Sequence, residues 1–96
     1  MATLDNTDFT EIRDFIRYSP NKQVFRDWGI EKPVWKLLFQ AAEDWFIGAF
    51  NTTPTTSFKG ALDAVMAAQL PEALPALTNP QAVAIGKTWM KWRFSK

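Results

Sequence analysis

The stretch PVWKLLFQAAEDWFIGAF, residues 33–50, is the longest apolar segment of the chain and decides its fold. On a helical wheel its polar side chains occupy a strip about 100° wide. This strip consists of Lys36, Gln40, Glu43 and Asp44. The other faces carry Trp35, Leu38, Phe39, Ala42, Trp45, Phe46 and Ala49. Because a helix that is apolar on most sides must be covered by other helices, the pattern predicts a central helix over residues 33–50.

Two shorter helices are predicted upstream of this segment. Asp8 and Glu11 fit a capping box, in which each side chain satisfies a backbone donor at the start of a helix. Ser19 followed by Pro20 is typical of a second helix start, and Gly29 is typical of a helix end.

Two more helices are predicted downstream. Ser57 or Thr56 caps a helix that extends to Leu70, and a proline-rich connector follows it. Asn79 and Pro80 then form the cap and first turn of the last helix.

Taken together, these signals predict an all-α fold. The chain shows no alternation of apolar and polar residues that would indicate strands. We therefore expect a single helical domain over residues 1–96, a compact bundle of about five short helices around residues 33–50.

The composition argues against an enzyme. The chain has no cysteine and no histidine, so thiolate chemistry, histidine acid–base catalysis and Cys/His zinc sites are excluded. No glycine-rich phosphate loop accompanies the acidic residues, which fit helix caps and exposed helix faces. We predict no catalytic, cofactor-binding or metal-binding residues, and no cofactor.

The charge is unevenly distributed along the chain. Residues 1–48 carry six Lys/Arg and eight Asp/Glu, a net charge of −2, whereas residues 49–96 carry five and two, a net charge of +3. The acidic N-terminus has no apolar run of a signal peptide. Lys36, Glu43 and Asp44 interrupt the longest apolar segment, so we expect no membrane span and no membrane partner.

The last ten residues, KTWMKWRFSK, combine basic and aromatic side chains. A helix from Pro80 to about Phe94 has an apolar arc of roughly 200°, wider than docking on one neighbour requires. Aromatic residues and Arg dominate interface energies. We therefore predict that this helix binds a protein partner or another copy of the chain. The predicted contact residues are Met90, Trp92, Arg93 and Phe94.

Nucleic acid is the alternative partner. The stretch NKQVFRDWGIEKPVWKLL, residues 21–38, resembles a helix-turn-helix in the spacing of its apolar residues around Gly29. It departs from that pattern at Phe25, where a small residue is wanted, and in the apolar character of its second helix. The basic side chains that would contact phosphates are Lys87, Lys91, Arg93 and Lys96.

The small, cysteine-free, Trp-rich helical chain resembles minor structural or accessory proteins of tailed bacteriophages. This resemblance lies in the character of the chain and not in a motif. It implies a role in virion assembly or in inhibition of a host protein. We therefore expect a soluble, non-enzymatic interaction or assembly module, located in the cytoplasm or within a virion assembly.

Overall fold

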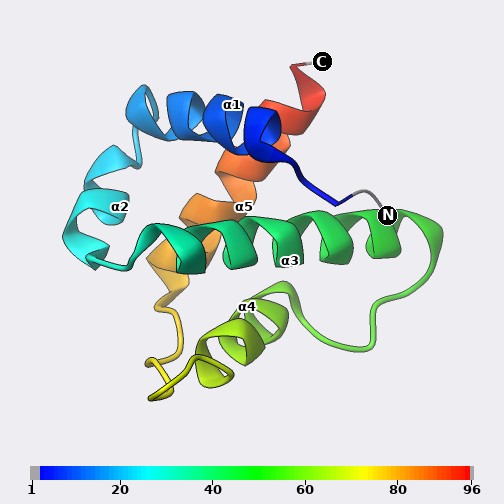
Figure 1. Cartoon of the computed structure of the whole chain (residues 1–96). Coiled ribbons are helices and arrows are strands. Elements are labelled where there is room, and N and C mark those ends of the chain that lie inside the picture. Colours follow the sequence, from blue (N-terminus) through cyan, green and yellow to red (C-terminus); the bar gives the residue numbers. More distant parts are fainter. Residues whose placement is uncertain (1–2, 96) are drawn as a thin grey trace.

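A computed structural model describes residues 3–95 as five helices without a strand, which confirms the all-α prediction (Figure 1). The helices are α1 (Asn6–Arg17), α2 (Lys22–Trp28), α3 (Lys32–Asn51), α4 (Phe58–Ala67) and α5 (Asn79–Phe94). The predicted helix at 33–50 is extended by one residue at each end. The helix predicted to extend to Leu70 ends three residues earlier, at Ala67.

The helices α1 and α3 lie one above the other in Figure 1, α2 joins them at one end, and α5 crosses behind both. The helix α5 contacts each of the other four helices. The long apolar α3 therefore shares the centre of the fold with α5. Gly86 of α5 permits close packing on α4 and α3, because a Cβ added there would lie 3.1 Å from the Phe58 ring of α4 and 3.9 Å from the Phe46 ring of α3.

The contact between α3 and α5 is centred on Trp89. Its ring stacks on Phe46 with centroids 4.3 Å apart, and its Nε1 donates to Glu43 Oε1 at 2.9 Å. Both Trp89 and Glu43 are fully buried. The prediction that Glu43 belongs to an exposed polar strip is therefore wrong, because the indole N–H of α5 offers that carboxylate a partner inside the core.

Helix starts are displaced from two of the predicted caps. The capping box of α1 joins Asp5 and Asp8, and that of α5 joins Thr78 and Gln81. The chain before α1 is already packed, since Leu4 is buried and its N–H donates to Gln40 Oε1 at 2.8 Å. Helix α1 consequently begins one turn earlier than the Asp8 cap predicted.

Two other predicted helix boundaries are confirmed and a third, at Ser19, is not. Ser57 caps α4 by accepting from the Gly60 N–H. Gly29 ends α2 in the left-handed region, at φ 69°, where a side chain would be strained. Ser19 does not cap α2; its hydroxyl accepts from the Asn21 N–H in the preceding turn.

Asp63 ties the connector after α4 back onto that helix. One carboxylate oxygen accepts from Lys59 Nζ and the other from the Leu77 N–H, each at 2.8 Å. The hydrogen bond from Lys59 is the main cause that lowers the pKa of Asp63. Burial raises this pKa, and the hydrogen bond from the Leu77 N–H lowers it further.

No helix within residues 3–95 has the length and apolar character needed to cross a membrane.

The buried Glu43–Trp89 hydrogen bond predicts a strongly coupled pair of substitutions. Glu43→Met leaves the indole N–H unpaired and should cost about 1–3 kcal/mol of unfolding free energy. Trp89→Phe leaves the carboxylate unpaired and opens a small cavity, so it should cost about 2–4 kcal/mol. The double variant should cost at least about 1 kcal/mol less than the sum of the two. Urea unfolding measures all three, and additive costs would contradict the coupling.

Asp63 predicts a pH-dependent contribution to stability. Because its pKa is lower in the folded than in the unfolded chain, its carboxylate stabilises the fold at neutral pH, and this contribution disappears as pH falls through the folded pKa. Asp63→Asn should lower the melting temperature at about pH 7 and much less at about pH 2. Lys59→Gln should show the same trend. Equal losses at both pH values would show that the charge of Asp63 is irrelevant.

Candidate binding groove

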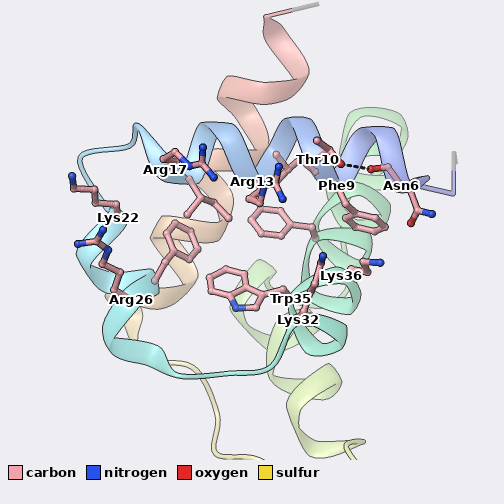
Figure 2. A pocket seen from close by; sticks show the side chains of 14 residues that line it. Asn6, Phe9, Thr10, Arg13, Arg17, Lys22, Arg26, Lys32, Trp35 and Lys36 are labelled. Atoms are coloured by element: carbon pink, nitrogen blue, oxygen red, sulfur yellow. Dashed lines mark hydrogen bonds between the residues drawn. The ribbon is translucent and has the colours of Figure 1, made fainter.

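A groove of about 690 Å³ lies between α1 and the first turns of α3, with α2 closing one end (Figure 2). The helix α1 contributes one wall with residues that recur on a single face over three turns. These are Asn6, Phe9, Thr10, Ile12, Arg13, Ile16 and Arg17. The other lining residues are Lys22, Phe25, Arg26, Lys32, Trp35, Lys36 and Phe39.

The floor of the groove is apolar and tightly packed. Ile12, Phe25 and Phe39 are buried, and Trp35 is half-buried between rings. The centroid of Trp35 lies 4.6 Å from that of Phe25 and 6.0 Å from that of Phe39. Trp28 meets Trp35 edge-on at 5.4 Å. These contacts hold the floor in one conformation, so the groove is a preformed surface.

The rim of the groove is basic. It carries all six Lys and Arg residues of segment 1–48 and none of the eight acidic residues of that segment. The six form one pair on each helix, Arg13 with Arg17, Lys22 with Arg26, and Lys32 with Lys36. Members of each pair are four residues apart, so they stand on the same helix face with a rise of about 6 Å. Figure 2 shows them around the groove.

Within residues 3–95, these six cations have no carboxylate within ion-pair distance; the ion pair found there joins Lys59 and Asp63. The nearest attractive contact is that of Lys36, whose Nζ lies 5.5 Å from the centroid of Phe9. Like charges one turn apart destabilise a helix by roughly 0.2–0.5 kcal/mol per pair. The repulsion within each pair therefore opposes the stability of its helix, and Arg17 and Arg26 offset part of it because they stand in the last turns of α1 and α2.

Six of the eight acidic residues of segment 1–48 accept hydrogen bonds from groups other than the rim cations, whereas Asp14 and Glu31 are exposed. Glu11 accepts from Trp92 Nε1 at 3.0 Å, and Glu43 accepts from Trp89. Asp44 accepts from Gln40. Glu11 also lines a smaller hollow with Asp14, on the side of α1 that packs against α5. The fold thus separates the charges of its first half, with cations on the groove side.

The C-terminal contact residues predicted from the sequence are not all accessible. Met90 and Phe94 are 38% and 67% exposed, and Arg93 is half-buried. Trp92 is only 1% exposed, so its side chain lies in the core of the structure and not on its surface, and its role as a partner contact stays a prediction. The reason is that α5 is covered on several sides: Trp89 packs towards α3, and Trp92 packs towards α1 through Glu11.

The described residues of the alternative nucleic-acid set lie on α5 and do not line the groove. Lys87 and Lys91 are exposed on α5 and lie outside the groove, while Arg93 is half-buried. Lys96 lies outside the described residues. The helix-turn-helix-like stretch does form two helices around Gly29, and four of its cations line the groove. They are Lys22, Arg26, Lys32 and Lys36.

The chemistry of the groove is suited to binding. Cations, an amide, a hydroxyl and apolar rings surround it, and the Thr10 hydroxyl donates to the backbone carbonyl of Asn6 at 2.9 Å.

Within residues 3–95, no group of three or more His, Cys, Asp or Glu side chains is arranged to hold a metal ion. Searches against protein-family models, curated proteins and solved structures give no match for this chain. The groove is therefore the feature on which a functional interpretation depends.

The repulsion on α1 predicts that a charge reversal in the groove stabilises the fold. Arg13→Glu replaces a like-charge pair with an opposite-charge pair to Arg17, and should raise the unfolding free energy by about 0.4–1 kcal/mol. Arg13→Gln removes only the repulsion and should give about half that gain. Urea unfolding at low ionic strength measures both. A loss of stability in both variants would mean that Arg13 serves the fold and not a partner.

Proposed function

We propose that this chain is a non-enzymatic interaction or assembly module that binds an acidic protein partner in the α1–α2–α3 groove. The observation that carries the proposal is the rim of six cations, without an acid, around an apolar floor. The repulsion among these cations costs stability in the free chain, so their arrangement is explained by the charge that they receive on binding.

The residue types of the groove favour a protein partner. Three of the six cations are arginines, whose planar guanidinium binds carboxylates in a bidentate manner. Arg and aromatic residues are also the types that dominate protein interfaces. The apolar floor adds area that a partner with apolar side chains would bury, whereas a purely polar polyanion would leave it wet.

Nucleic acid is the second candidate because four of the six cations belong to the helix-turn-helix-like stretch. Six phosphate contacts would make log K fall with log salt at a slope of about −4 for a single strand. The floor is less suited to this ligand. Bases stack on open ring faces, but Trp35 presents only part of its ring because three rings pack around it, and Lys36 lies over Phe9.

A second contact surface is proposed at the end of α5. Phe94 and Phe50 are exposed, with centroids 6.5 Å apart, and Met90 is exposed on the same helix as Phe94. These side chains are candidates for contact with the same partner or with another copy of the chain. A setting in virion assembly or in inhibition of a host protein is consistent with a small binding module.

The proposal is tested by selection of peptides from a random display library on the immobilised chain. Enriched peptides should be acidic and apolar, and should lose binding to the double variant Arg13→Gln/Arg17→Gln. The matched control is Lys87→Gln/Lys91→Gln, which removes an equal charge from a pair with the same spacing outside the groove, and should retain binding. Enrichment of peptides that bind all three proteins equally would contradict the proposed site.

A further inference from the structure

The side chains of the groove recur at the spacing of a helix–helix interface. On α1, lining residues stand at 6, 9, 10, 12, 13, 16 and 17, which is one continuous face. On α2 they stand at 22, 25 and 26, and on α3 at 32, 35, 36 and 39. This i, i+3, i+4, i+7 pattern is the one by which a helix packs against another helix. Ile12, Phe25 and Phe39 of these faces are already buried in the core, whereas the other lining side chains are half-buried or exposed at the groove surface.

The backbone of the groove excludes most other peptide conformations. An extended peptide needs backbone donors and acceptors from a strand edge, and the groove has helical walls whose backbone groups are bonded internally. A helical peptide satisfies its own backbone groups, so it needs only side-chain contacts from the groove. The α1 wall from Asn6 to Arg17 is about 17 Å long, equivalent to three turns of such a peptide.

The positions of the cations indicate where a bound helix would carry acidic residues. Cations one turn apart stand on each wall, Arg13 and Arg17 on α1 and Lys32 and Lys36 on α3. Acidic side chains at i and i+4 on a bound helix have the same rise of about 6 Å. Such a helix would place Asp or Glu opposite each pair, in the way that flanking charges select partners in coiled coils.

From this geometry we infer that the partner segment is an amphipathic helix of about three turns, whose apolar stripe is flanked on both sides by acidic residues. The inference rests on the proposed function and adds the conformation of the occupant. Apolar side chains at i, i+3, i+4 and i+7 enter the groove above Ile16 and Trp35, while the acidic flanks meet the basic rim. The bound helix completes the packing of α1 and α3.

The test compares fluorescent probes in titrations followed by anisotropy. The main probe is a peptide of about 14 residues with Leu at the stripe positions and Glu on both flanks. Its controls are a scrambled peptide of the same composition, the same helix with Lys in place of Glu, and an oligothymidylate of about 12 nucleotides. The helical acidic peptide should bind at least about tenfold more tightly than each control, and should gain helical circular dichroism on binding.

Matched variants locate the site. Arg13→Gln/Arg17→Gln should weaken binding of the acidic helix by about tenfold or more, and Lys87→Gln/Lys91→Gln by less than about twofold. Thr10→Trp places a bulky ring on the exposed α1 wall and should block the groove. Thr7→Trp, which is exposed on α1 but does not line the groove, should leave binding unchanged.

The outcomes separate the two proposals. Equal binding of the helical and scrambled acidic peptides, both sensitive to the arginine variant, overturns the helical occupant and leaves the acidic-partner groove intact. Tighter binding of the oligothymidylate overturns both proposals in favour of nucleic acid. Absence of groove-dependent binding of either acidic peptide also overturns both.

Discussion

The hydrogen bond from Trp89 to the buried carboxylate of Glu43 is the interaction on which the arrangement of the helices depends. A buried carboxyl group is costly unless it is bonded, and within residues 3–95 only its Oε1 has a partner, so this hydrogen bond favours the observed placement of α3 and α5. Trp92, three residues further along α5, donates to Glu11 of α1. Two tryptophans on one helix thus hold α3 and α1, and the groove lies between the two helices that they anchor.

Much of the fold is predictable from local sequence signals, because those signals act over a few residues. The apolar faces of residues 33–50, the left-handed turn at Gly29 and the Ser57 cap all depend on near neighbours. The environment of Glu43 depends on a partner 46 residues away, and that of Glu11 on one 81 residues away. Helical periodicity cannot reveal such partners, because a helical wheel assigns every charged side chain to the solvent-exposed face.

The candidate site was less accessible to sequence reasoning than the fold. The net charge of −2 over residues 1–48 conceals the basic rim, because averaging ignores which helix face each charge occupies. The visible signal is the repeated spacing of four residues within three successive helices, Arg13 to Arg17, Lys22 to Arg26 and Lys32 to Lys36. The wide apolar arc of α5 is likewise no sign of a free surface, because four neighbouring helices contact α5 and Trp92 is buried.

The separation of charge between the groove and the acidic side chains elsewhere also bears on how quickly a partner is found. A net charge of +1 produces little attraction at long range, so the chain does not concentrate on every polyanion that it meets. The local field of the basic rim becomes important within about a Debye length, roughly 8–10 Å. An acidic partner that diffuses to this distance is turned towards the groove before the surfaces touch, and encounters with the opposite side are discouraged. Under the proposed function, the same arrangement would favour rapid and oriented association while limiting indiscriminate binding.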